Sequence, residues 1–84
     1  MREAVIITGA SSGIGAAVSE RLCDMDYEVF GFGRNFELCK LKRENFHPII
    51  CDLLDTAKLT GQVKRIAAEW EIHVLINNAG VAYY

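Results

Sequence analysis

The sequence predicts an α/β protein in which a doubly wound parallel sheet has helices on both faces. Short β-branched apolar runs alternate along the chain with amphipathic helical patterns, in the order β-α-β-α-β-α-β. The connections between strands are long enough for crossover helices, and this alternation implies parallel strands joined by right-handed crossovers. For strands numbered along the chain, the doubly wound arrangement predicts the sheet order 3-2-1-4.

The first half of the chain predicts two strands with one helix between them. Residues 4–8 are a β-branched apolar run that suits a strand buried on both faces. A loop rich in Gly and Ser spans residues 9–15, and residues 27–32 predict the second strand, which ends in turn chemistry. The buried face of the helix is expected where apolar residues recur at helical spacing, at Ile14, Ala17, Val18 and Leu22.

The next segment predicts a short helix followed by a strand. Residues 36–45 read as an amphipathic helix with Leu38 and Leu41 inward, and its basic residues fit a solvated face (Lys40, Lys42 and Arg43). The third strand is expected over residues 49–51 and starts at His47-Pro48, because proline is tolerated as a first strand residue.

A longer helix and a fourth strand complete the pattern. Asp55 or Thr56 is expected to N-cap the helix. Its apolar stripe is Leu59, Val63, Ile66 and Trp70, and for Trp70 core packing is favoured over a cofactor role. Residues 72–76 predict the last strand, which leads into Asn77-Asn78-Ala79-Gly80.

Composition restricts the class of protein. Of the 84 residues, 51% are apolar and 24% charged, which excludes intrinsic disorder. The apolar runs are far shorter than the roughly 18 residues of a spanning helix, and the net charge of −2 does not favour nucleic acid. We therefore expect neither a membrane nor a nucleic acid as partner. Because a strand-like run begins at Ala4, we also expect no secretory signal, and residues 1–84 as one compact unit.

The 3 cysteines are widely spaced and form no Cys-x-x-Cys pair. This spacing fits no metal site. We expect Cys23, Cys39 and Cys51 to be buried free thiols in a reducing, cytoplasmic environment.

The segment Thr8-Gly9-Ala10-Ser11-Ser12-Gly13-Ile14-Gly15 joins the first strand to the first helix, where an anion is expected. A helix N-terminus has unpaired N–H groups and a partial positive charge. Gly9 would permit a tight turn, Gly13 the close approach of a pyrophosphate, and Gly15 the contact between helix and strand. The spacing is neither Gly-x-Gly-x-x-Gly nor that of a P-loop. For the loop alone, the alternative is a turn that binds nothing.

Three motifs resemble those of the short-chain dehydrogenase/reductase family. The glycine segment is similar to the family signature, Asp52-Leu53 resembles its adenine-contacting pair, and Asn77-Asn78-Ala79-Gly80 matches its Asn-Asn-Ala-Gly motif. Each stands at the carboxyl end of an expected strand, and the resemblance covers essentially the whole chain. The gap between Gly9 and Gly13 resembles that of the compact main branch.

The resemblance implies a Rossmann-type fold with a dinucleotide cofactor. Asp52 would accept a hydrogen bond from the adenine amino group, with the Leu53 backbone alongside. The other implied cofactor-binding residues are Gly9, Ser11, Ser12, Gly13, Ile14 and Gly15 at the phosphates and ribose, Arg34 and Asn35 after the second strand, and Asn78, Ala79 and Gly80 beside the ribose.

The turn after the second strand predicts NADP(H) rather than NAD(H). An acidic residue at this place would hold the ribose 2′-hydroxyl, but residues 31–35 contain no Asp or Glu. Gly33 stands where NAD-using relatives carry aspartate, and Arg34 resembles the basic residue of NADP-using relatives. A guanidinium can bind the 2′-phosphate in a bidentate manner. The alternative is a solvated turn arginine without a ligand.

The implied activity is hydride transfer between a carbonyl and an alcohol. The family's catalytic Ser and Tyr-x-x-x-Lys lie beyond the Asn-Asn-Ala-Gly motif, so residues 1–84 are expected to be an amino-terminal half that contains no catalytic residue and no metal ligand. Two alternatives remain: a non-catalytic NADP-binding module or remnant, and an interaction module. The interaction module would pair with a partner through the exposed last strand. Under every reading, residues 1–84 are expected to form a homo-oligomer, because residues 74–76 are an apolar edge strand that can pair with another copy.

Overall fold

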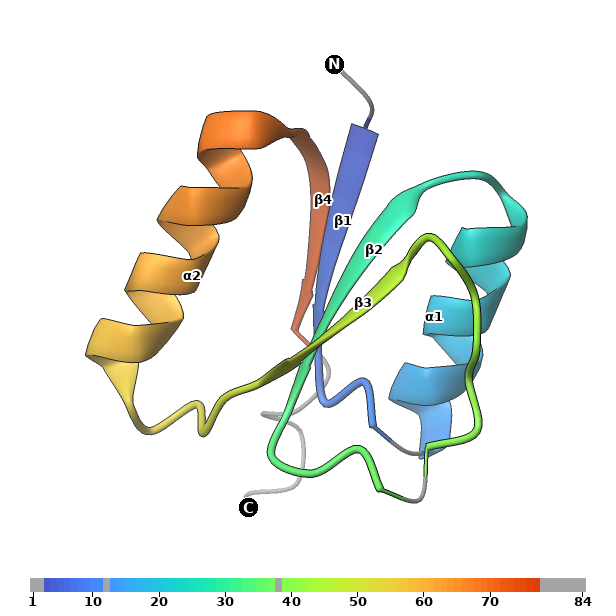
Figure 1. The fold of residues 1–84 in the computed structure, drawn as a ribbon, viewed down its shortest axis with the longest axis horizontal. Coiled ribbons are helices and arrows are strands. Elements are labelled where there is room, and N and C mark those ends of the chain that lie inside the picture. The colour runs from blue at the N-terminus through green and yellow to red at the C-terminus, as the bar shows by residue number, and fades with distance from the viewer. Residues whose placement is uncertain (1–2, 12, 38, 78–84) are drawn as a thin grey trace.

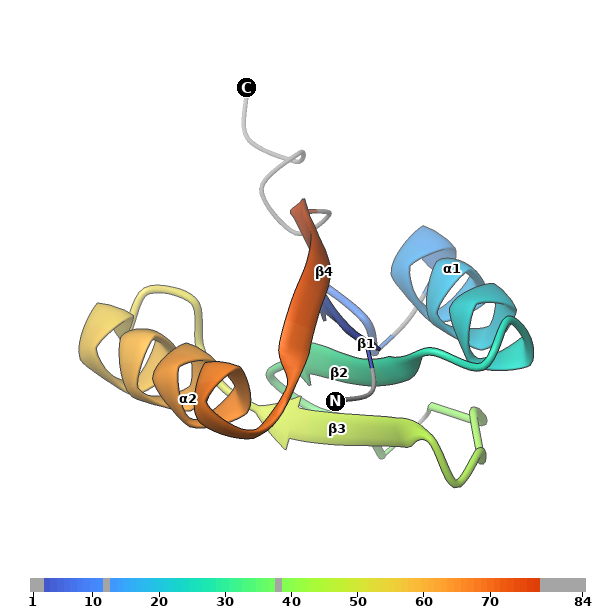
Figure 2. The same ribbon diagram turned by 90° about the horizontal axis from the view of Figure 1, so that it is seen from above.

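The computed structural model describes residues 3–11, 13–37 and 39–77, and it forms a four-stranded parallel sheet with one helix on each face (Figures 1 and 2). In chain order the elements are β1 (Glu3–Thr8), α1 (Gly13–Asp24), β2 (Glu28–Gly33), β3 (Phe46–Ile50), α2 (Thr56–Glu69) and β4 (Glu71–Asn77). The sheet order is β3-β2-β1-β4, which confirms the predicted order 3-2-1-4.

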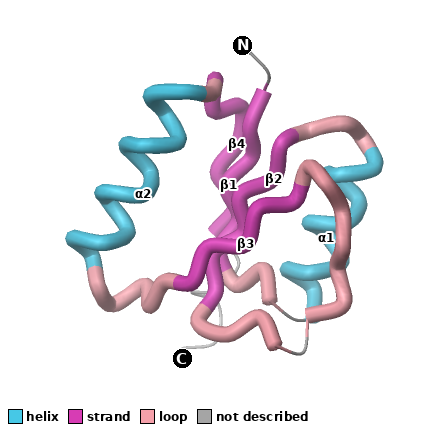
Figure 3. The backbone as a smooth tube through the Cα atoms, in the orientation of Figure 1, coloured by secondary structure: helices cyan, strands magenta, loops and turns pink. Residues whose placement is uncertain are grey.

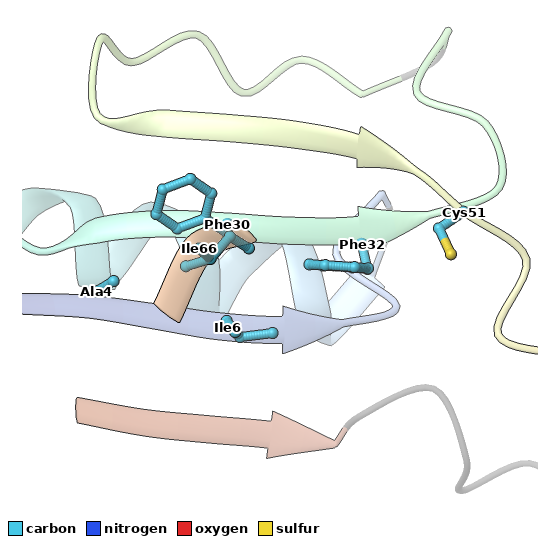
Figure 4. Packing of buried hydrophobic residues seen from close by; sticks show 6 residues of the cluster. All are labelled: Ala4, Ile6, Phe30, Phe32, Cys51 and Ile66. Carbon is cyan, nitrogen blue, oxygen red and sulfur yellow. The ribbon is translucent and has the colours of Figure 1, made fainter. Parts of the chain in front are cut away.

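The core consists of two layers, one on each side of the sheet. β1 is buried from Ala4 to Thr8, as its unbroken apolar run predicted. Beneath α2 lies the cluster of Ala4, Ile6, Phe30, Phe32, Cys51 and Ile66, which is drawn in Figure 4. Beneath α1 lies a second cluster of Ile7, Ala10, Cys23, Val29 and Phe46.

Helix α2 agrees with its predicted stripe and cap. Ile66 is buried, while Leu59, Val63 and Trp70 pack against the α2-side cluster. The Asp55 carboxylate accepts a hydrogen bond from the Lys58 backbone N–H, so Asp55 is the N-cap. The core role of Trp70 is confirmed by its tilted contact with Phe30, at 5.8 Å between ring centroids.

The buried face of helix α1 is only partly the predicted one. Ile14 is 75% exposed, and Ala17 is exposed as well. The buried residues are Gly15, Ser19 and Cys23, and the Ser19 hydroxyl donates to the Gly15 carbonyl oxygen over 2.8 Å. Small side chains on this face let the helix approach the sheet closely, and the local bond satisfies the buried hydroxyl. Val18 and Leu22 pack against the cluster as expected.

The helix predicted over residues 36–45 is absent from the described part of this segment, which is a loop (Figure 3). The chain must return here along the length of the sheet, and ten residues of helix span only about 15 Å, less than the 17–20 Å of a typical strand. Long-range contacts hold the loop instead. The Asn45 amide donates to the carbonyl oxygens of Cys23 (2.9 Å) and Tyr27 (2.8 Å).

Other parts of this loop behave as predicted in spite of its conformation. Leu41 packs against the α1-side cluster, and Lys40, Lys42 and Arg43 are exposed. Arg43 pairs with Glu20 on α1. Leu38 lies outside the described residues.

Strand β3 begins earlier than predicted, and Pro48 lies within it rather than at its start. Pro48 is in register with Gly31 of β2. At the two ends of this pairing the Val29 N–H donates to the Asn45 carbonyl oxygen, and the Cys51 N–H donates to the Gly33 carbonyl oxygen. Because strand residues alternate in direction, the backbone nitrogen of Pro48 faces away from β2, where no ladder bond requires a donor.

Candidate functional site: a cleft at the carboxyl ends of the strands

The glycine loop connects β1 to α1 through two residues with positive φ. Gly9 has φ 67° and Gly13 has φ 58°, a region that glycine enters without steric cost. The tight turn predicted at Gly9 is therefore confirmed. The Ala10 backbone N–H donates to the Phe32 carbonyl oxygen over 3.1 Å, which fixes the loop against the end of β2.

An open cleft of about 1210 Å³ lies beside this loop, at the carboxyl ends of all four strands. Open parallel sheets bind ligands at this end. Its apolar wall lies between the sheet and α2 and includes Ile6, Phe32, Leu59, Val63 and Leu75. Its polar rim comes from the loops and strand ends. The rim includes Thr8, Gly9, Ser11, Gly33, Arg34, Asn35, Asp52 and Asn77, with the Leu53 and Leu54 segment alongside.

The structure brings six of the sequence-predicted site residues together in this cleft. They are Gly9, Ser11, Arg34, Asn35, Asp52 and Leu53. Gly13, Ile14 and Gly15 follow in the first turn of α1 and are not among the cleft-lining residues. Ser12 and residues 78–80 lie outside the described residues. The predicted residues that line the cleft come from three separate loops, which follow β1, β2 and β3.

Arg34 lies at the rim of the cleft and is exposed. In the parts of the chain that the structure describes, no carboxylate forms an ion pair with it. The neighbouring Asn35 closes the turn, because its side-chain oxygen accepts from the Glu37 backbone N–H over 2.8 Å. A guanidinium without an acidic partner at this place can bind an anion.

Asp52 holds the turn from β3 into α2. Its Oδ1 accepts from the Leu54 N–H over 3.0 Å, and its carbonyl oxygen accepts from the Asp55 N–H over 2.9 Å. The cap of α2 is Asp55, so Asp52 is not the capping residue of the helix. Among the described residues only Oδ1 of the Asp52 carboxylate accepts a hydrogen bond, and Asp52 lines the cleft.

Sequence reasoning missed Thr8 and Asn77 as cleft residues. The Thr8 hydroxyl donates to the Asn77 side-chain oxygen over 3.0 Å and links the ends of β1 and β4. Their positions at the carboxyl ends of adjacent parallel strands were the available signal, because such ends meet at one edge of the sheet.

The cysteines only partly follow the prediction of buried thiols. Cys23 and Cys51 are buried, but Cys39 is half-buried, and all three are free. Burial raises the pKa of the Cys23 thiol to about 11, with a smaller opposing effect from Arg43. Cys51 lines the cleft.

The sheet order, the glycine loop and the cleft at the strand ends define a Rossmann-type nucleotide-binding architecture. The family model for short chain dehydrogenases matches residues 3–83. The chain therefore belongs to the short chain dehydrogenase family.

Neither helix in the described residues is long and apolar enough to cross a membrane.

Two curated relatives and one solved structure illustrate the similarity. An "NADPH-dependent 3-dehydrocapnine reductase" of Ornithobacterium rhinotracheale is 37% identical over 100% of this chain and 32% of its own length. An "NADP-dependent 3-hydroxy acid dehydrogenase" of Escherichia coli (strain K12) is 34% identical over 93% of this chain and 34% of its own. The structure "ElxO with NADP Bound" superposes with a TM-score of 0.79 at 29% identity, covering 93% of this chain and 35% of that one. The chain thus spans about a third of each.

Proposed function

We propose that this chain provides the NADP(H)-binding part of an oxidoreductase that transfers hydride between a carbonyl and an alcohol. The observation that carries the proposal is Arg34, which lies exposed at the cleft rim without an ion-pair partner in the described residues. Residues 31–35 supply no carboxylate to repel a 2′-phosphate. Two relatives named as NADP(H)-dependent enzymes support the proposal.

Within this proposal the glycine loop binds the pyrophosphate and the adenosine ribose. The N–H groups at the start of α1 and the positive end of its dipole favour an anion. A Cβ built on Gly13 would meet nothing within 4 Å, so the space above it is open. The residues proposed for this part are Gly9, Ser11, Ser12, Gly13, Ile14 and Gly15.

The adenine is proposed to lie against the turn after β3. Asp52 keeps Oδ2 available while Oδ1 holds the Leu54 N–H, so the carboxylate can accept from the adenine amino group beside Leu53. Asn35 is proposed to support the turn that carries Arg34. Asn78, Ala79 and Gly80 are proposed to lie beside the ribose. Together these residues make residues 1–84 part of a single dinucleotide-binding domain.

The test is the affinity of the full-length protein for both cofactors after Arg34→Ala. A charge-assisted hydrogen bond contributes about 1.5–3 kcal/mol, so NADPH binding should weaken about tenfold to a hundredfold. NADH binding should barely change. Arg65→Ala is the matched control, because Arg65 is an exposed arginine on α2 that does not line the cleft. Equal weakening of both cofactors by Arg34→Ala would contradict the proposal.

A polypeptide of residues 1–84 is proposed to be catalytically inactive. Its sequence contains no Tyr-x-x-x-Lys, and hydride transfer to a carbonyl needs a proton donor within hydrogen-bond reach. Turnover of NADPH with a panel of ketones and aldehydes should equal that of a heat-denatured sample. Reproducible turnover above that level would show that other residues in this polypeptide supply the proton.

A second candidate function is a non-catalytic NADP-binding module that associates through β4. Among the described residues β4 has a neighbouring strand on one side only, and its Val74 and Leu75 are 40% and 63% exposed. An apolar edge strand favours pairing with a second copy. For residues 1–84, light scattering at high concentration should show a dimer or larger species, which Leu75→Lys should shift toward the monomer. A monomer at all concentrations would exclude this candidate.

A further inference from the structure

The end of β2 leaves little room for a side chain at Gly33. A Cβ built there would lie 3.1 Å from the Phe36 ring carbon Cζ, and 3.1 Å from both Cβ and Oγ of Ser11. Such distances are shorter than ordinary van der Waals contact, so the neighbours would have to move. Gly33 is therefore enclosed by the glycine loop and by Phe36.

Phe36 is the apolar anchor of the turn that carries Arg34. Its ring packs against the α1-side cluster and makes an edge contact with Phe46, at 6.2 Å between centroids and 61° between planes. The Phe36 carbonyl oxygen also accepts from the Cys39 N–H over 3.1 Å. These contacts and the hydrogen bond from the Glu37 N–H to Asn35 anchor the turn, which no helix follows in the described residues.

We propose that Phe36 is a positioning residue for cofactor selection, a proposal that rests on the NADP(H) function proposed above. The ring fills the space that an acidic side chain at Gly33 would require, and it holds the turn so that Arg34 faces the cleft. Selection of NADP(H) then depends on three residues. Arg34 supplies the attraction, whereas Phe36 and Ser11 exclude the carboxylate that NAD(H) would need.

The first experiment measures NADPH and NADH affinities of the full-length protein with Phe36→Ala, Arg34→Ala and the double substitution. Phe36→Ala should weaken NADPH binding about threefold to tenfold and change NADH binding little. In the double variant the loss should be smaller than the two single losses combined. Phe36→Leu keeps an apolar side chain against Phe46 and should retain most of the preference for NADPH.

The readout that separates positioning from general stability is the ratio of the two affinities. If Phe36→Ala lowers the melting temperature and weakens both cofactors equally, Phe36 is only structural and the proposal is wrong. If Arg34→Ala changes the ratio but Phe36→Ala does not, the role of Phe36 is wrong while the proposed function stands. If Arg34→Ala leaves the ratio unchanged, the proposed function of Arg34 fails instead.

The second experiment tests the space above Gly33 and does not depend on Arg34. Gly33→Asp alone should weaken both cofactors, because the carboxylate displaces Phe36 and Ser11. Gly33→Asp combined with Phe36→Ala should bind NADH several-fold more tightly than Gly33→Asp alone, since the ring has been removed. An equal gain in NADH affinity from Gly33→Asp alone would overturn the proposal.

Discussion

Gly31→Ala is the substitution whose cost follows most directly from the packing. A Cβ at Gly31 would lie 2.7 Å from the Ala10 Cβ, and 2.8 and 2.9 Å from the Phe46 ring carbons Cε1 and Cζ. Neither neighbour moves freely, because Ala10 is hydrogen-bonded to Phe32 and the Phe46 ring is buried. Overpacking of this kind costs about 1–3 kcal/mol, and the reduced entropy of the unfolded chain offsets about 0.4–1 kcal/mol of it.

Because the contacts at Gly31 are shorter than 3.0 Å, we expect the upper part of the resulting range, so that Gly31→Ala lowers the free energy of unfolding by about 1–2.6 kcal/mol. The matched control is Gly61→Ala on the exposed face of α2, where an added Cβ meets nothing within 4 Å. It should stabilise the protein by about 0.5–1 kcal/mol, because alanine has a higher helix propensity than glycine. Urea unfolding of residues 1–84, followed by the fluorescence of Trp70, the single tryptophan of this segment, measures both. A Gly31→Ala variant as stable as the wild type would refute the packing argument.

Three further predictions concern the cap of α2, a buried thiol and the edge of the sheet. Asp55→Ala should cost about 1 kcal/mol in urea unfolding, whereas Asp55→Asn keeps the capping oxygen and should cost less; equal costs would refute the cap. Burial favours the neutral Cys23 thiol, so its contribution to stability is complete below the ordinary pKa of 9.0 and falls as the pH rises toward 11. At pH 8 a thiol reagent should modify Cys39 before Cys23, and the reverse order would contradict this reasoning. Pro48→Thr adds an N–H that faces away from β2, so light scattering should show more association than for the wild type; no change would mean that Pro48 does not protect this edge.

The strands and their order were predictable because the signal for them is local. The run from Ala4 to Thr8 is apolar at nearly every position, and such a run in an alternating α/β pattern fits an interior parallel strand. The alternation of strands and helices implies a doubly wound sheet, and that arrangement predicts the strand order 3-2-1-4. The cap at Asp55 was predictable for the same reason, since its partner Lys58 is three residues away.

The loop over residues 36–45 was not predictable, because its contacts are distant in sequence. Asn45 binds carbonyl oxygens 22 and 18 residues earlier, and Arg43 binds carboxylates 23 and 19 residues earlier. A short amphipathic pattern contains no information about such partners. The span of the sheet then favours an extended path over a helix, and tertiary contacts override the local preference.

The buried face of α1 was mispredicted at Ile14 and Ala17, because the size of a side chain mattered more than its hydrophobicity there. The Ile14 side chain is more hydrophobic than those of Gly15 and Ser19, yet it is 75% exposed, while Gly15 and Ser19 are buried. The position of α1 depends on how closely its first turns approach the strands. A larger residue on that face would move the N–H groups at the start of the helix away from the cleft.

The glycines of β2 and the glycine loop form one packing arrangement. Gly31 and Gly33 point to the same face of the sheet, because strand residues alternate, and the space beside each is occupied by consecutive loop residues, Ala10 and Ser11. A side chain at Gly31 would therefore force the loop or Phe46 to shift, and one at Gly33 would require a smaller adjustment of Ser11 and Phe36. The place of the cleft rim thus depends on Gly31, which does not line the cleft. It follows that a larger side chain at Ala10 should displace the loop as Gly31→Ala does, and should weaken NADPH and NADH binding alike.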